Sequence, residues 1–104
     1  MFARIATFEI PPGTPPEVGE RIVEGVRRRM SEGGGPTGAE RVLILAEPER
    51  NRALNITLFD SEENLKAAEP FFESMTPIEP ERGGRRTDVG HFRVLLDEAV
   101  AEHA

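Results

Sequence analysis

Side chains that could carry chemistry recur at alternate positions of two short segments. The segment LNITLF contains Asn55, Thr57 and Phe59, and the segment VGHFRV contains His91 and Arg93. If both segments are strands, alternate residues point to the same side of a sheet, so these side chains can face one space. An imidazole in that space could take a proton from a phenolic substrate near neutral pH. His91 is therefore the candidate catalytic base.

Other polar groups could hold the substrate of such a base. Arg93, together with Arg4 from the opening segment FARIATFEI, could stabilise a phenolate or enolate, and Asn55 could orient the substrate or oxygen. A structural alternative stays open, because His91 has no orienting acid nearby in the sequence, and Asn55 and Thr57 could satisfy each other or a buried water. The candidate substrate-binding residues are Arg4, Asn55, Thr57, Phe59 and Arg93.

Three further patterns do not predict a binding or modification site. The run GGGPTG, residues 33 to 38, matches G-x-G-x-x-G, but it follows a predicted helix and precedes a predicted strand, the reverse of a dinucleotide fingerprint. The arginines at 27 to 29 fit a solvated helix face, and those at 82 to 86 fit an exposed loop. Asn55 begins a glycosylation sequon, but no secretory signal accompanies it and its predicted place is inside a sheet.

Composition limits the classes of function. The chain has 104 residues, a net charge of -6 and no cysteine, which predicts one small domain without disulfides, thiolate metal sites or cysteine nucleophiles. The acidic balance argues against nucleic acid as the main partner, and the absence of a long apolar run argues against a membrane span. No metal-ligand spacing or nucleotide-binding motif indicates a metal or another cofactor. We expect a cytoplasmic protein.

The elements that would position these residues follow from periodicity and turn signals. Strands are predicted at residues 2 to 10, 39 to 47, 52 to 60 and 87 to 96, with a short tail at 97 to 104. A helix that ends at Gly33 should begin after a capping box at Thr14. A second helix should be capped by Asp60 or Ser61 and should kink or restart at Pro70. The order βαββαβ predicts an α+β, ferredoxin-like domain over residues 1 to 104, with a four-stranded antiparallel sheet.

Two helices can cover only one face of this sheet, which leaves the other face for a partner. The wholly apolar strand sides, which carry Leu54, Ile56 and Leu58 on one strand and Phe92 on another, are expected to meet the helices. The other face, which carries Phe8, Phe59, Val89 and Leu95, is expected to meet the same face of a second copy. This predicts a homodimer joined through its sheet faces, with the candidate site in the cleft between them.

The order of elements, the junction ITLFDSEENLKA and the opening ARIATFEI resemble the dimeric α/β barrel superfamily, in particular small proteins of the antibiotic biosynthesis monooxygenase-like type. The resemblance covers nearly the whole chain. It implies a dimeric barrel. The superfamily includes cofactor-independent monooxygenases of aromatic polyketides and quinols as well as haem-degrading enzymes. The haem-degrading members rely on an asparagine, a tryptophan and a histidine. This chain has no tryptophan or tyrosine, and Phe59 stands where related sequences often place a tryptophan.

Two kinds of function are consistent with these observations. The first is a monooxygenase that acts on an aromatic or quinone-like small molecule without a protein-bound metal or flavin. The second is a non-catalytic dimer that binds a small metabolite in the same cleft or has only a structural role. The missing tryptophan and tyrosine weigh against the first, so the sequence does not decide whether the protein is an enzyme.

Overall fold

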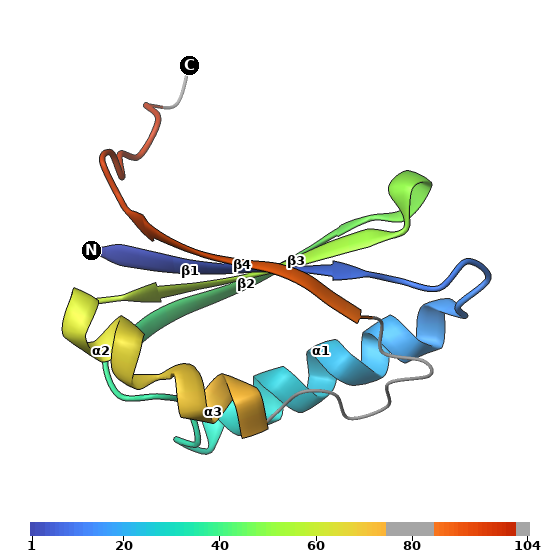
Figure 1. Ribbon diagram of the computed structural model, residues 1–104, viewed down its shortest axis with the longest axis horizontal. Helices are drawn as coiled ribbons and strands as arrows, with labels where there is room; N and C mark the ends of the chain where they lie inside the picture. The colour runs from blue at the N-terminus through green and yellow to red at the C-terminus, as the bar shows by residue number, and fades with distance from the viewer. Residues whose placement is uncertain (75–84, 102–104) are drawn as a thin grey trace.

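The computed structural model describes residues 1 to 74 and 85 to 101. Within these residues, a single sheet of four strands carries all the helices on one side and none on the other (Figure 1). The strand order is β2-β3-β1-β4 and the pairs β1–β3, β1–β4 and β2–β3 are antiparallel, which confirms the predicted ferredoxin-like arrangement. The elements are β1 (Phe2–Glu9), α1 (Pro16–Ser31), β2 (Ala39–Glu47), the 3₁₀ turn η1 (Pro48–Arg50), β3 (Arg52–Phe59), α2 (Glu62–Ala67), α3 (Glu69–Ser74) and β4 (Arg85–Arg93).

The two helix starts differ in how the sequence specifies them. At α2, the Ser61 side chain accepts a hydrogen bond from the backbone N–H of Asn64, which confirms the predicted cap and selects Ser61 over Asp60. At α1, Pro15 is the cap residue and no side chain caps the helix, so the predicted capping box is wrong. The Thr14 hydroxyl donates instead to the carbonyl of Pro11, 2.6 Å away, and closes the preceding turn.

Pro70 divides the second helical segment, as predicted. The chain forms two short helices, and Ala68 ends the first of them. The second of these helices begins at Glu69, one residue before the proline. Proline's fixed backbone angle is tolerated this close to a helix start. The predicted end of this segment before Pro77 lies outside the described residues. The last strand begins two residues before its predicted start and ends at Arg93, three residues before its predicted end.

The helices cover the opposite face of the sheet from the one expected. Phe59 is fully buried in a cluster with Leu65, Ala68 and Phe72 of the second helical segment, and the Phe59 and Phe72 rings meet edge to face at 6.3 Å. In antiparallel strands paired residues share a face, so Phe2, the partner of Phe59, also lies on the helix side. The mixed polar face is therefore the covered one.

The more apolar face of the sheet is left without a helix, and we call it the open face. Leu45 and Phe92 on this face are 44% and 53% exposed. The expectation that the open face would carry Phe8, Phe59, Val89 and Leu95 is wrong. That expectation assigned the helices to the more apolar side of the sheet. In the structure, α3 supplies a carboxylate and an aromatic ring that accommodate polar side chains of the other face. The strand pairing places these apolar residues on the open face: Ala3, Ile5, Leu43, Leu45, Leu54, Ile56, Leu58 and Phe92.

Candidate functional site

A cluster of three ionisable side chains joins the two adjacent strands β1 and β4 to α3. The Nε of Arg4 donates to Oε1 of Glu69 at 2.7 Å, and Nε2 of His91 lies 3.2 Å from the same oxygen. We call Arg4, Glu69 and His91 the polar cluster. Arg4 and His91 are paired across the two strands, so their side chains leave the sheet side by side toward the helices. The restart of the helix at Glu69 brings the carboxylate over both of them.

Arg4 is the buried member of the polar cluster. It is 3% exposed, and its guanidinium carbon lies 4.0 Å from the centre of the Phe72 ring, a cation–π geometry. Its Nη2 is buried and has no hydrogen-bond partner within the described residues. A buried donor without a partner is costly, and functional sites are one of the places where such donors occur. The Arg4 guanidinium is therefore held between Glu69 and Phe72, with one nitrogen that has no hydrogen-bond partner among the described residues.

The Glu69 carboxylate is held in its charged form. The hydrogen bond from Arg4 is the largest influence that lowers its pKa below the usual value, and the hydrogen bond with His91 and the charges of both partners act in the same direction. Partial burial opposes them by raising the pKa, but the net direction is downward. Glu69 is therefore a carboxylate at neutral pH.

His91 and Glu69 form an acid–base pair at the protein surface. The imidazole is 39% exposed, so a ligand in solution can reach it while Glu69 fixes one ring nitrogen. If Nε2 carries the proton, Nδ1 is free to accept one from a substrate, and the carboxylate stabilises the imidazolium that results. No residue near His91 in the sequence was predicted to orient it. The structure supplies one from a residue 22 positions earlier, a distance that no local spacing rule detects.

Of the other candidate residues, Thr57 and Phe59 are buried, whereas Arg93 is exposed. Thr57 is buried, and its hydroxyl donates to Oδ1 of Asn55 at 3.3 Å, so these two side chains do partly satisfy each other. Phe59 belongs to the core. Arg93 is exposed at the end of β4, opposite Phe2 in the register. All of them share the helix side of the sheet with the polar cluster, so they do not lie on the face that was expected to meet a second sheet.

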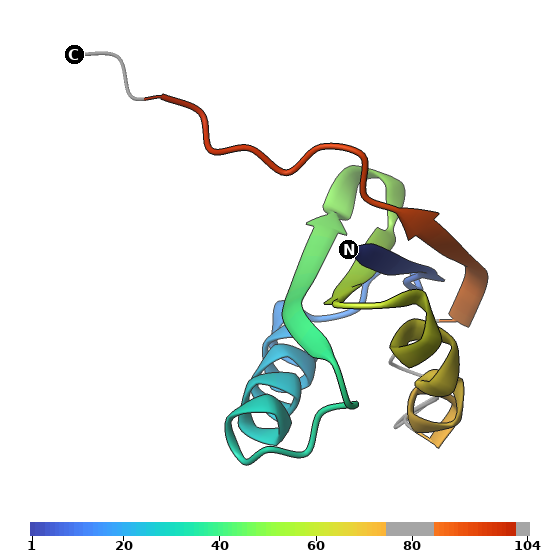
Figure 2. The ribbon, with the colours of Figure 1, turned by 90° about the vertical axis from the view of Figure 1, so that its left-hand side faces the viewer.

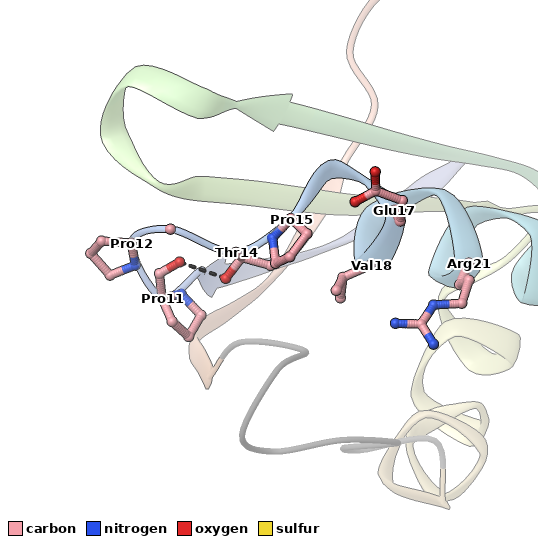
Figure 3. Close-up of a pocket in the computed structure, with 8 residues that line it drawn as sticks. Pro11, Pro12, Thr14, Pro15, Glu17, Val18 and Arg21 are labelled. Carbon is pink, nitrogen blue, oxygen red and sulfur yellow. Dashed lines mark hydrogen bonds between the residues drawn. The ribbon is translucent and has the colours of Figure 1, made fainter.

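Two surface grooves lie away from the polar cluster. One has a volume of about 570 Å³ and lies where the loop Pro11–Pro15 meets the first turns of α1 (Figure 3), with Glu17 and Arg21 at its helix side. The other has a volume of about 770 Å³ and separates α1 from β2, with Val26, Met30 and Ile44 among its lining residues. Neither groove is lined by the polar cluster, Asn55 or Arg93.

The described part of the chain has no group of three or more histidine, aspartate or glutamate side chains placed to hold a metal ion. Over the same residues, no helix has both the length and the apolar character needed to cross a bilayer.

Among known proteins, this chain matches solved structures by its fold. No protein-family model and no curated protein matches the sequence. Among solved structures, the haem-degrading protein MhuD of Mycobacterium tuberculosis, solved with two haems in its active site, is 20% identical with a TM-score of 0.68, and the match covers 95% of this chain and all of MhuD. A provisionally named antibiotic biosynthesis monooxygenase of Bordetella bronchiseptica is 15% identical with a TM-score of 0.65, covering 91% of this chain and 97% of that one.

A second protein with the same provisional name, from Bacillus cereus, is 20% identical with a TM-score of 0.57, and the match covers 98% of both chains. At such low identity these likenesses establish the fold and leave the activity to be argued from the residues themselves. The chain shares its ferredoxin-like fold with these solved structures, two of which are provisionally named antibiotic biosynthesis monooxygenases.

Proposed function

We propose that this protein is a homodimeric monooxygenase that acts on an aromatic or quinone-like small molecule without a protein-bound metal or flavin. The observation that carries the proposal is the polar cluster, in which one carboxylate oxygen contacts both a buried arginine and an accessible imidazole. Such a cluster combines a base, a group that orients it and a cation for the anion that forms. Solved structures that share the fold of this chain include proteins provisionally named as monooxygenases.

Each member of the polar cluster has a role in this proposal. His91 removes a proton from a phenolic or enolic hydroxyl, and Glu69 stabilises the imidazolium. The exposed guanidinium of Arg93 and the positive charge of the buried Arg4 stabilise the resulting anion. Asn55, whose carbonyl oxygen is engaged by Thr57, orients the substrate or oxygen through its amide N–H groups. The electron-rich anion then gives electrons to dioxygen: one oxygen atom forms a bond to the substrate carbon and the other leaves as water, with the substrate supplying both the electrons and the hydrogens.

The proposed dimer forms through the open face. Eight apolar residues from all four strands lie there, and Phe92 remains more than half exposed. Exposed apolar surfaces of this kind mark interfaces in small proteins, and a partner sheet would remove this one from water. A face-to-face pair leaves the helix side of each copy, with its polar cluster, outside the interface. The expectation of a cytoplasmic protein remains a prediction.

Haem has to be considered for this fold, because MhuD is a haem-degrading protein. His91 is the one histidine within the described residues, and its Nε2 lies 3.2 Å from Glu69. A haem iron would therefore have to be bound by Nδ1, with Glu69 holding the other ring nitrogen, an arrangement common for metal-bound histidines. Neither of the two grooves described above is lined by His91, and the proposal assigns no step to haem.

A non-catalytic small-metabolite-binding or structural dimer is the second candidate. The observation that favours it is the separation between the two grooves and the polar cluster, since a ligand held in either groove would not reach His91. Under this alternative the contacts among Arg4, Glu69 and His91 serve to fasten α3 to the sheet.

Oxygen consumption separates the two candidates. The wild type, His91→Ala and Glu69→Gln are incubated with a panel of quinols and aromatic polyketides, and Ser31→Ala, at the exposed end of α1, serves as the matched control. The proposal expects turnover in the wild type and the control, with losses of about 10²-fold or more in His91→Ala and a smaller loss in Glu69→Gln. Saturable binding without oxygen uptake would favour the second candidate, and undiminished turnover in His91→Ala would remove this histidine from the mechanism.

A further inference from the structure

A second ion pair joins α3 to β4, one helical turn beyond the polar cluster. The Nη2 of Arg86 donates to Oε1 of Glu73 at 2.7 Å, and the Arg86 side chain is 24% exposed, although it was expected in an exposed loop. Glu69 and Glu73 are four residues apart, so both project from one face of α3. Figure 2 shows the second helical segment beneath the β4 side of the sheet and α1 beneath the β2 side. Both ends of α3 are therefore bound to the same strand.

An irregularity in β4 brings Arg86 to the helix side. Arg86 and His91 are five residues apart, and side chains at an odd separation in a regular strand point to opposite faces. The pairing with β1 shifts by one residue here, so that Thr87 is extra and Arg86 is paired with Phe8. Phe8 shares its face of β1 with Arg4, the partner of His91. Such bulges re-aim a side chain, and this one aims Arg86 at α3.

The orientation of α3 depends on contacts outside the helix itself. The helix has six residues, too few to be stable alone, and its buried side chain Phe72 packs against Phe59 and Arg4. One apolar anchor holds a short helix in place but leaves it free to turn about that contact. The bond between Glu73 and Arg86 adds a second fixed point at the far end of the helix.

We propose that Arg86 is a positioning residue of the candidate site. By holding Glu73, it fixes α3 in the orientation that places Glu69 in the polar cluster. Arg86 touches no reacting group in this role, which rests on the proposed function because Glu69 orients the proposed base. Partly exposed ion pairs add little to stability, so the loss of this one should loosen the contacts of Glu69 without unfolding the domain.

Titration of Glu69 tests this role without a substrate. The pKa of Glu69 is lowered from 4.5 chiefly by the hydrogen bond from Arg4, and the hydrogen bond with His91 acts in the same direction. These two residues are the charged partners of Glu69 within the described residues. If α3 turns away from the sheet, both hydrogen bonds lengthen and the pKa of Glu69 rises toward its usual value. Carbon-13 NMR of the side-chain carboxyl groups follows this titration, with Glu69→Gln identifying the signal.

Glu73→Ala gives the sharper of two tests, because its direct electrostatic effect has the opposite sign. Removal of a nearby negative charge by itself lowers the pKa of Glu69, whereas loss of positioning raises it. Alanine also favours the helix, so the substitution does not weaken α3 through its intrinsic propensity. We expect the pKa of Glu69 to rise in Glu73→Ala and in Arg86→Ala. Arg86→Lys, which keeps the charge and a donor, should stay nearer to the wild type.

The control is Arg85→Ala. Arg85 is the neighbouring arginine of β4, and it pairs with Glu9 of β1 at 3.2 Å instead of with α3, so its loss should leave the Glu69 titration unchanged. Far-UV circular dichroism verifies the fold of each variant. An unchanged or lower pKa of Glu69 in folded Glu73→Ala would overturn the positioning role and leave the proposed chemistry standing.

Oxygen uptake separates this role from the proposed function. In the quinol and polyketide assay, the loss of turnover in Arg86→Ala should not exceed that in Glu69→Gln, because Arg86 acts through Glu69. A larger loss would overturn a role confined to positioning. A raised pKa of Glu69 in Glu73→Ala, together with no turnover by the wild type, would support the positioning of Glu69 and overturn the proposed function.

Discussion

Glu69 and His91, which are 22 residues apart in the chain, meet at 3.2 Å between Oε1 and Nε2, and the same oxygen accepts a hydrogen bond from Arg4 at 2.7 Å. One carboxylate oxygen therefore connects a short helix to two adjacent strands. This contact serves the fold by fastening α3 and serves the proposed chemistry by orienting an imidazole.

The stability supplied by Glu69 should depend on pH. The pKa of Glu69 in the folded protein is lowered from 4.5, chiefly by the hydrogen bond from Arg4. A carboxyl group with a depressed folded pKa stabilises the fold above its unfolded pKa, and this contribution is lost as the pH falls through the folded pKa. Glu69→Gln should therefore lower the free energy of unfolding at pH 7, and the difference from wild type should shrink below about pH 4.5. Urea unfolding of both proteins across this range measures it, and a difference that is constant with pH would contradict the expectation.

Arg4 should contribute to stability through both its charge and its volume. Arg4→Ala removes the hydrogen bond to Glu69 and leaves a space beside Phe72, and we expect a loss of about 2–4 kcal/mol in the free energy of unfolding. Arg4→Met keeps most of the volume and also removes the unpartnered Nη2, so it should cost less than Arg4→Ala.

Arg27→Ala is the control for these arginine variants. Arg27 has a surface ion pair with Glu24 and a side chain that is 71% exposed. Its replacement should change stability by less than about 0.5 kcal/mol in the same urea titration. If Arg4→Ala were as mild as Arg27→Ala, the buried arginine would have no structural role.

Removal of the Ser61 cap should cost more than removal of Thr14, although both hydroxyls precede a helix. Ser61 accepts the N–H of Asn64 and caps α2, so Ser61→Ala should lower the free energy of unfolding by about 1 kcal/mol. Thr14 caps nothing and donates to an exposed turn carbonyl, so Thr14→Ala should cost less than about 0.5 kcal/mol. Paired thermal and urea unfolding curves measure both variants, and equal losses would restore the capping role expected for Thr14.

The sequence predicted the bounds of the helices and strands better than the sheet face that the helices cover. The bounds depend on local chemistry. The bounds of β2 follow from the branched apolar run that ends at Pro48, and the break before α3 follows from Pro70. The face covered by the helices depends on contacts distant in sequence. Phe59 is buried by Phe72, and Arg4 is paired with Glu69, so the more polar side of the sheet became the covered one. Strand alternation grouped His91 with Arg4, but no spacing rule could supply Glu69 from α3.

The open face should control dimer formation without controlling the fold. Leu45 and Phe92 are 44% and 53% exposed in the single chain, so the double substitution Leu45→Glu and Phe92→Glu places charges on the surface of a monomer but inside a dimer. We expect the variant to be monomeric by light scattering at concentrations where the wild type is a dimer, with unchanged far-UV circular dichroism. Ser31→Glu on the helix side is the control. A double variant that remained dimeric would show that the copies meet through another surface.

Gly38 should be the glycine least tolerant of a side chain in the loop before β2. Its φ of 81° lies in the left-handed region, and an added Cβ would come closer than 3.0 Å to the side chains of Asp60 and Asn64, which hydrogen-bond each other at 2.8 Å beside the start of α2. Gly33, with φ of 76°, has open space around an added Cβ, so its substitution measures the cost of the left-handed backbone alone. Gly33→Ala should cost about 1–2 kcal/mol and Gly38→Ala about 2–4 kcal/mol, because only the second adds a steric conflict to the backbone strain. Urea unfolding compares the two, and equal losses would mean that the Asp60–Asn64 pair yields without cost.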